Sequence, residues 1–288
     1  MHYTSAENGL KIINTRTMWM RNTNCMTDYS EVQHGFDTLN RFLADTSIGG
    51  EFKNALNGGV AGVGAQAFAL FNQWWNDIRF NTYIACVSEH HDSEDQHGRL
   101  SMWRAFVGTT ARVALVFRTP LTEDPAPSLN LLMIPVAYHT NAEVEGELRS
   151  VIKNIKDNQQ FLRSIDRATF VQAIFFMLVT SVVCLKHEGF REEREWRVIY
   201  SPNQRPSPLI SSSIEVVGGV PQTVYKIPLT GGSPDLANIA ISNLVDRVII
   251  GPSPYPWPMY EAFVSALTAA NVADARSRVF VSGIPIRS

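Results

Sequence analysis

The chain has 288 residues, of which 45% are hydrophobic and 18% charged, and its formal net charge is −2. This length provides one large domain or two small ones with a substantial core, and the apolar content excludes wholesale disorder. The near-neutral charge argues against a surface coated in basic residues for nonspecific nucleic-acid binding. Three widely separated cysteines predict reduced thiols, and the N-terminal residues lack signal-peptide features, so we expect a cytoplasmic protein.

Hydrophobic periodicity predicts secondary-structure elements along the whole chain. In the first half these are a strand at 2–4, a helix at 6–13, a strand at 17–21, helices at 28–43 and 68–78 separated by a glycine-rich bend at 57–64, and strands at 81–88, 112–118 and 130–138. In the second half they are helices at 143–165 and 167–185, a strand at 196–200, an exposed loop at 201–213, strands at 224–227 and 247–250, a helix at 258–270 and a strand at 279–281.

The predicted strands and helices do not alternate regularly, and no internal repeat is present. These features exclude a doubly wound parallel sheet and a repeat array. We therefore expect an α+β protein with one domain over residues 1–288, built on a mixed or antiparallel β core. Helical insertions are expected near 28–78 and 143–185.

Residues 168–185 contain no charged side chain, and 18 residues are the minimum for a membrane span. Thr169, Gln172, Thr180 and Ser181 dilute this run, and Asp166 stands where a helix N-cap is expected. A fully buried central helix explains the segment better than a membrane span, so no membrane association is predicted.

The densest local signal is the charged stretch 186–197, KHEGFREEREWR. Its simplest interpretation is a solvated turn with surface ion pairs. However, Phe190 follows a glycine at a turn, and Glu195 stands at the mouth of the strand that follows. Glu193 and Glu195 would share one face if both lay on that strand. A carboxylate held at such a position suits glycosyl transfer, because it stabilises the positive charge that develops as a leaving group departs.

Two further strand ends carry polar side chains. His2 and Thr4 alternate on the first predicted strand and therefore point to the same face, where they can present hydrogen bonds to a ribose or a diphosphate. Ser88 ends the strand at 81–88, where it can brace a catalytic carboxylate or simply terminate the strand.

Other residues leave a structural and a functional interpretation open. Trp103 with Arg104, and Trp19 with Arg21, can stack on a base and neutralise phosphates, or they can be core tryptophans with snorkelling arginines. The loop at 89–99 is rich in histidine and acid but lacks the ordered spacing of metal ligands, so no metal site is predicted.

Several short pieces of the chain resemble an uncharacterised bacterial family, domain of unknown function 2971. The pieces are Tyr3-Thr4-Ser5, Trp19 to Asp28, Ile84 to Glu89, Met102-Trp103, the strand ending at Phe117, Glu193 to Arg197, and Val248 to Pro252. Where that family has Asn-Asp-Pro, only Asp28 corresponds here. The family name itself implies no chemistry.

The order of the polar motifs resembles the ADP-ribosyltransferase fold, a split mixed or antiparallel β core. Its sites combine a first-strand His or Arg, a middle-strand Ser or Tyr and a late Glu, to which His2, Ser88 and Glu195 correspond in order. Glu193-Arg194-Glu195 is similar to the Glu-x-Glu signature of that fold, and the Phe190 turn to its substrate-recognition turn. The start of the chain, with His2 and Thr4, is similar to DNA-modifying toxins and RNA 2′-phosphotransferases.

This resemblance implies an NAD-dependent ADP-ribosyltransferase, with NAD as substrate and a protein or nucleic acid, RNA or DNA, as acceptor. Glu195 and Ser88 would be catalytic, and Phe190 and Glu193 would bind the acceptor. The expected NAD-binding residues are His2, Tyr3, Thr4, Arg21, Trp103 and Arg104. Such an enzyme would serve as an intracellular toxin or anti-phage effector, with an antitoxin or regulatory protein as partner. Two alternatives remain: a non-enzymatic nucleotide-sensing or interaction module of the same fold, and a metal-dependent nucleic-acid enzyme that uses the acidic residues of 89–94.

Overall fold

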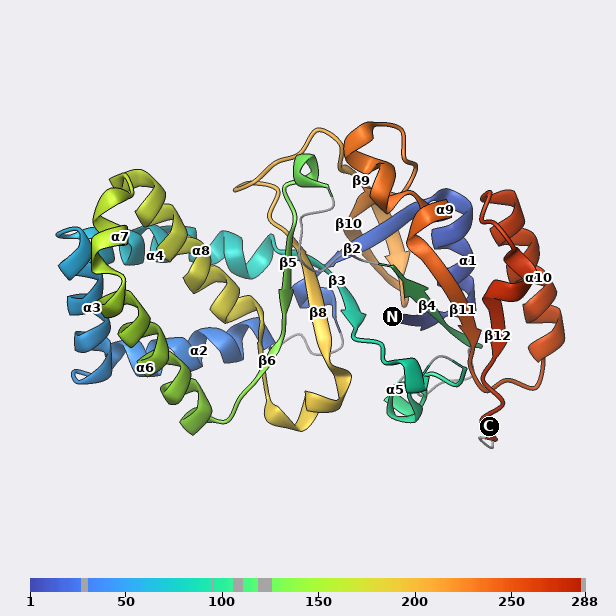
Figure 1. The fold of residues 1–288 in the computed structure, drawn as a ribbon, viewed down its shortest axis with the longest axis horizontal. Helices are drawn as coiled ribbons and strands as arrows, with labels where there is room; N and C mark the ends of the chain where they lie inside the picture. The colour runs from blue at the N-terminus through green and yellow to red at the C-terminus, as the bar shows by residue number, and fades with distance from the viewer. Residues whose placement is uncertain (27–30, 95, 106–110, 119–125, 286–288) are drawn as a thin grey trace. The chain divides into compact units, whose positions relative to one another are not determined.

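A computed structural model describes residues 1–26, 31–94, 96–105, 111–118 and 126–285 of the chain. Helices and strands are both abundant, and the sheets are mixed and antiparallel, which confirms the α+β class (Figure 1). The chain divides into two compact units. Unit 1 comprises Met1–Arg21, Tyr83–Met133 and Glu192–Ser288, and unit 2 comprises Asn22–Thr82 and Ile134–Arg191. The helices expected near 28–78 and 143–185 lie in unit 2, and a single domain over 1–288 stays a prediction.

Unit 1 contains a four-stranded sheet in the order β1-β4-β11-β12. Its strands are β1 (His2–Ser5), β4 (Arg112–Phe117), β11 (Val245–Ile250) and β12 (Val279–Val281). The pairs β1/β4 and β4/β11 are antiparallel, whereas β11 and β12 are parallel. His2 faces Leu115 across the first pair, and Leu115 faces Val248 across the second, so the N-terminal strand is an integral edge of the sheet.

The second sheet has the order β5-β8-β3-β2-β10-β9. Its strands are β5 (Leu132–Pro135), where the chain passes from unit 1 to unit 2, β8 (Glu195–Tyr200), β3 (Tyr83–Ser88), β2 (Thr17–Asn22), β10 (Val220–Pro228) and β9 (Ser211–Val217). The pairs β3/β8, β2/β10 and β9/β10 are antiparallel. The register within β3/β8 places the two strand ends singled out by the sequence, Ser88 and Glu195, directly opposite each other.

The strand β9 was not expected, because its first residues are serines and the sequence favoured a loop up to residue 213. Gly218 and Gly219 both have positive φ and form a two-residue turn between β9 and β10, so that β10 runs back along β9. Such turns require positive φ at both central positions, which glycine adopts without steric cost. The tight hairpin therefore extends the edge strand over three serines that do not by themselves predict β structure.

The α-helices among the described residues of unit 1 are α1 (Ala6–Thr15), α5 (Leu100–Ala105), α9 (Ile241–Leu244) and α10 (Pro256–Ala269). Ser5 caps α1 by accepting a hydrogen bond from the Asn8 amide, as expected where a strand turns into a helix. Helices α1 and α10 lie side by side against the four-stranded sheet (Figure 1). Ile13 of α1, Leu115 of β4 and Phe263 of α10 are fully buried there.

This core also receives side chains from the second sheet, including those of Met20, Tyr83 and Tyr200. The two sheets of unit 1 therefore share one apolar core. On the other face of the four-stranded sheet, Tyr3 packs with Trp103 of α5 in a separate cluster.

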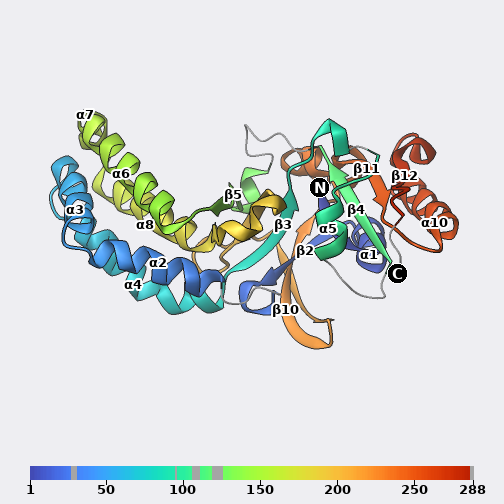
Figure 2. The same ribbon diagram turned by 90° about the horizontal axis from the view of Figure 1, so that it is seen from below.

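Unit 2 is mainly helical (Figure 2). Its helices are α2 (Glu31–Ala44), α3 (Ile48–Gly59), α4 (Val63–Phe80), α6 (Asn141–Asp157), α7 (Gln159–Ser164) and α8 (Arg167–Val183), and a short parallel pair joins β6 (Ala137–Tyr138) to β7 (Leu185–Lys186). The single helix expected at 143–165 is divided at Asn158, whose side chain bonds back to the Asn154 carbonyl. Helix α3 was not expected, and Asp28 lies outside the described residues.

Helix α8 contains most of the uncharged segment 168–185. Asp166 caps it by accepting a hydrogen bond from the Thr169 amide, as predicted. The helix packs against α2 and α4 and buries eight apolar side chains, among them Phe175, but Gln172 and Ser181 are exposed. The expectation of a fully buried helix is therefore wrong on one face. Among the described residues, no helix combines the length and apolarity that a membrane span requires.

Candidate functional site

Three of the predicted site residues meet where β1, β3 and β8 approach one another in unit 1. Ser88 ends β3 and is the cross-strand partner of Glu195, which begins β8. Directly opposed residues of an antiparallel pair project their side chains to the same face. The Ser88 amide donates to the Met1 carbonyl at 2.6 Å, and His2 Nδ1 lies 2.8 Å from the Cys86 carbonyl oxygen. The fold therefore brings His2, Ser88 and Glu195 into one neighbourhood from distant parts of the sequence.

Glu195 is buried beside a second charged residue of the same strand. The side chains of Glu195 and Arg197 are 6% and 2% exposed, and Arg197 Nε donates to Glu195 Oε1 at 2.8 Å. Residues two apart on a strand share a face, which makes this pairing possible. Because an uncompensated charge is costly in a packed interior, the guanidinium stabilises the Glu195 carboxylate and also fixes its orientation.

His2 is held as a neutral imidazole. Burial lowers the pKa of His2 below its usual range, an effect that the hydrogen bond with the Cys86 carbonyl partly offsets. A carbonyl oxygen can only accept, so Nδ1 must carry the proton, which leaves Nε2 as an acceptor in the neutral ring. His2 can therefore accept a hydrogen bond from a hydroxyl group.

The backbone immediately before Glu195 is in an unfavourable conformation. Arg194 has φ = 44°, in the left-handed region that residues with a side chain seldom adopt. Its side chain forms an ion pair with Glu94, and its carbonyl accepts from the Glu89 amide at 2.8 Å. Strained residues of this kind cost about 1–3 kcal/mol and persist where surrounding contacts enforce them, often at functional sites.

Arg99 holds the same turn in place, although no motif in the sequence singles it out. Its guanidinium donates to the main-chain carbonyls of Glu192, Glu193 (3.1 Å) and Glu89 (2.9 Å), and it pairs with the Glu94 carboxylate at 3.1 Å. One side chain thus ties the loop after β3 to the turn before β8. Five donors on a planar guanidinium suit such a role, but the acceptors come from segments that only the fold brings together.

The histidine- and acid-rich loop at 89–99 contains a short 3₁₀ turn, η2 (Asp92–Glu94). The Glu94 carboxylate is held by Arg99 and Arg194, and Asp95 lies outside the described residues. In the part of the chain that the structure describes, no three His, Cys, Asp or Glu side chains are grouped in a way that could hold a metal ion. The contacts of Glu94 with Arg99 and Arg194 give this carboxylate a structural role.

Glu193 and Phe190 do not lie on the strand. Both belong to the 3₁₀ helix η4 (Glu188–Glu193), and the left-handed Arg194 separates this helix from β8. The expectation that Glu193 and Glu195 share a strand face is therefore wrong, because the backbone changes direction between them. Phe190 is 40% exposed and belongs to unit 2, where Lys186 Nζ lies 4.7 Å from its ring centroid.

Tyr3 and Trp103 are packing residues. They are 6% and 1% exposed, and their rings meet edge to face with centroids 4.9 Å apart. The Tyr3 hydroxyl accepts from the Arg99 amide at 2.8 Å, and Trp103 Nε1 donates to the His97 carbonyl at 2.8 Å. Of the two interpretations that the sequence left open for Trp103, this burial favours a core role over stacking on a base, and it does the same for Tyr3.

The remaining predicted NAD-binding residues are distributed over three elements. Thr4 lies on β1, on the face of His2 and opposite Val113. Arg21 lies on β2, and its Nε donates to Gln222 Oε1 at 3.2 Å. Arg104 is exposed on α5. The structure thus keeps Thr4 beside His2, whereas Arg21 and Arg104 are positioned by other elements.

Comparisons with known proteins add one match. No curated protein and no solved structure matches the chain. Residues 102–198, which include Trp103 and the Glu193–Arg197 stretch, match the model of a family described as Protein of unknown function (DUF2971), which confirms the expected resemblance over this part of the chain.

Proposed function

We propose that the protein is an NAD-dependent ADP-ribosyltransferase that modifies a macromolecular acceptor, protein or nucleic acid, as an intracellular toxin or anti-phage effector. The observation that carries this proposal is the convergence of His2, Ser88 and Glu195 at three strand ends of unit 1. Their order along the chain and their placement on strand ends both correspond to the resemblance described above.

In this reaction the bond between C1′ of the ribose and the nicotinamide nitrogen breaks, and its electron pair leaves with neutral nicotinamide. The acceptor nucleophile then forms a bond to C1′ and loses its proton to solvent or a base. Positive charge accumulates on the ribose in between, and the Glu195 carboxylate, bonded to the 2′-hydroxyl, would stabilise it. Ser88 would orient that carboxylate, and the neutral His2 would accept a bond from a ribose hydroxyl.

The ion pair with Arg197 supports a second candidate. A carboxylate that is 6% exposed and already neutralised by a guanidinium is held in place, but ribose must compete with Arg197 for its oxygens. A non-enzymatic module that binds a nucleotide in the same neighbourhood, without cleaving it, needs no such competition. NAD binding without nicotinamide release would identify this alternative.

The test is a nicotinamide-release assay on the full chain with NAD, with RNA, DNA or protein as acceptor. Glu195→Gln should lower kcat about 10²–10³-fold, the usual effect of removing one preorganised electrostatic group, while the Kd for NAD changes little. Glu215→Gln is the matched control, because Glu215 lies in the same sheet, on β9, and is paired with Lys226. Equal rates for wild type and Glu195→Gln would refute the transferase proposal. The assignment of Phe190 and Glu193 to the acceptor stays a prediction that acceptor-transfer rates would test.

A further inference from the structure

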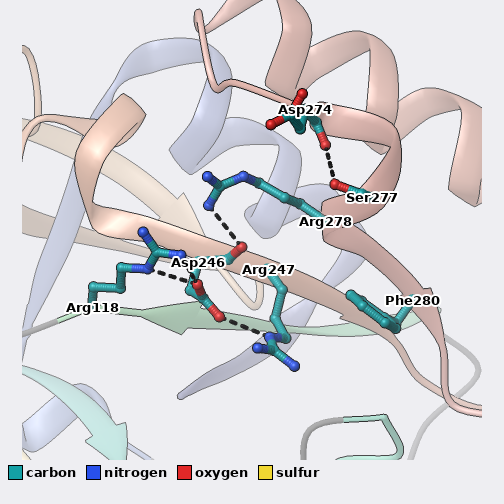
Figure 3. A pocket seen from close by; sticks show the side chains of 7 residues that line it. All are labelled: Arg118, Asp246, Arg247, Asp274, Ser277, Arg278 and Phe280. Carbon is teal, nitrogen blue, oxygen red and sulfur yellow. Dashed lines mark hydrogen bonds and ion pairs between the residues drawn. The ribbon is translucent and has the colours of Figure 1, made fainter.

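A cavity of about 220 Å³ opens in unit 1 at the start of β11. Three arginines from different segments line it: Arg118 directly after β4, Arg247 on β11, and Arg278 at the end of the 3₁₀ helix η6 (Ala275–Arg278) (Figure 3). None of these residues belongs to the neighbourhood of Glu195. Guanidinium groups that converge from separate elements repel one another, so other contacts must hold them in this arrangement.

Asp246 holds two of these arginines in place. Arg118 Nε donates to Asp246 Oδ1 at 2.7 Å, and Arg247 Nε donates to Oδ2 at 2.8 Å, so the two side chains reach the carboxylate from either side (Figure 3). Partial burial raises the pKa of Asp246, but the hydrogen bonds from Arg247 and Arg118 outweigh it and lower the pKa below its usual range. The carboxylate is therefore charged at neutral pH and orients both guanidinium groups.

Arg278 is held differently. Its Nε donates to the Ala273 carbonyl at 2.7 Å, and Nη1 donates to the carbonyls of Val245 at 3.0 Å and Asp246 at 3.1 Å. Within the described residues, it forms no ion pair with a carboxylate. Main-chain carbonyls fix the direction of this guanidinium without neutralising its charge. The cavity is lined by three guanidinium groups and by two carboxylates, those of Asp246 and Asp274, so its lining carries a net positive charge.

We propose that this cavity binds the phosphate group of a small phosphorylated ligand. Guanidinium groups bind phosphate oxygens with paired, charge-assisted hydrogen bonds, and prior orientation by Asp246 and the carbonyls lowers the entropy lost on binding. The volume is below the roughly 300–1,000 Å³ of pockets that enclose drug-sized ligands, so the cavity fits a phosphate and only part of an attached group. Phe280 forms one wall of the cavity, and the Arg247 guanidinium lies 5.4 Å from its ring centroid. This ring offers an apolar surface to the part of the ligand that is attached to the phosphate.

The test is isothermal titration calorimetry of the full chain at low ionic strength. The probes are inorganic phosphate, a nucleoside 5′-monophosphate and the corresponding nucleoside without phosphate. Wild type should bind both phosphate-bearing probes and not the nucleoside. If the monophosphate binds more tightly than inorganic phosphate, the site recognises a phosphomonoester. If the two bind equally, the site recognises the phosphate group alone.

Two variants remove lining charges, and a third is the control. Arg278→Gln and Arg118→Gln should each weaken phosphate binding about tenfold or more, as expected for the loss of a charge-assisted hydrogen bond. Arg276→Gln removes an arginine of the same 3₁₀ helix that is paired with Glu261 and does not line the cavity, so its affinity should equal that of wild type. Arg118 is 62% exposed, so its variant will fold even if Arg278→Gln does not.

The proposal is overturned if wild type binds neither phosphate-bearing probe. It is also overturned if Arg276→Gln weakens binding as much as Arg118→Gln, because that result indicates a general attraction to positive charge. Neither outcome bears on the transferase proposal, which depends on Glu195 and on nicotinamide release.

Discussion

Replacing Arg197 by Met should destabilise the protein strongly, because the substitution leaves the Glu195 carboxylate without this partner in the interior. Methionine keeps much of the side-chain volume, so the change removes mainly the charge and its hydrogen bonds. The Arg197 side chain is 2% exposed, and its Nε lies 2.8 Å from Glu195 Oε1.

Removing one partner of a buried ion pair costs about 3–5 kcal/mol, because the remaining charge stays out of water and has lost its opposite charge. Many domains have a total free energy of unfolding of only about 5–15 kcal/mol, so this loss would be plain in a urea titration. The double variant Glu195→Gln/Arg197→Met should recover part of it, since it removes both charges.

The assay is a double-mutant cycle on the free energy of unfolding, which isolates the coupling of the two side chains from their other contacts. Arg149 and Glu145 provide a matched control pair on α6. Their N–O distance is also 2.8 Å, but their side chains are 53% and 45% exposed. The coupling between Arg149 and Glu145 should be far smaller, because water screens exposed charges. Equal coupling in the two pairs, or an Arg197→Met variant as stable as wild type, would refute the argument from burial.

Three further predictions concern other parts of the structure. Burial lowers the pKa of His2 in the folded state, so the unfolded chain binds the proton more readily. The free energy of unfolding should therefore be highest above the unfolded pKa of about 6.5 and should fall as the pH is lowered through that value. His2→Asn should flatten this dependence, which urea midpoints measured from pH 5 to 8 would show. A Cβ at Gly35 of α2 would collide with a main-chain carbonyl of α8, so Gly35→Ala should lower the stability of the protein by about 1–3 kcal/mol in thermal denaturation. Gly50 of α3 has open space around it, so Gly50→Ala should raise the stability by about 0.5–1 kcal/mol. Phe175→Asp should prevent folding, seen as loss of the cooperative transition, because it buries a lone charge, while Gln172→Glu on the exposed face of α8 should leave the transition unchanged.

The sequence by itself determined the features that depend on neighbours along the chain. Alternating or continuous apolar residues predicted β4 and α8, the Asp166 carboxylate predicted the start of α8, and the polar strand ends marked His2, Ser88 and Glu195. Periodicity and capping depend on residues that are close together in the sequence, so they can be recognised without knowledge of the fold.

The tertiary structure alone decided what surrounds those residues. It paired Glu195 with Arg197 in the interior, placed Arg99 across the turn that Arg194 makes in the left-handed region, and buried Trp103, which the sequence had left open. It also turned three arginines that no motif connects toward one cavity beside Asp246. These contacts join residues far apart in the chain, and their energies depend on burial and mutual orientation, which only the packing of the sheets and helices establishes.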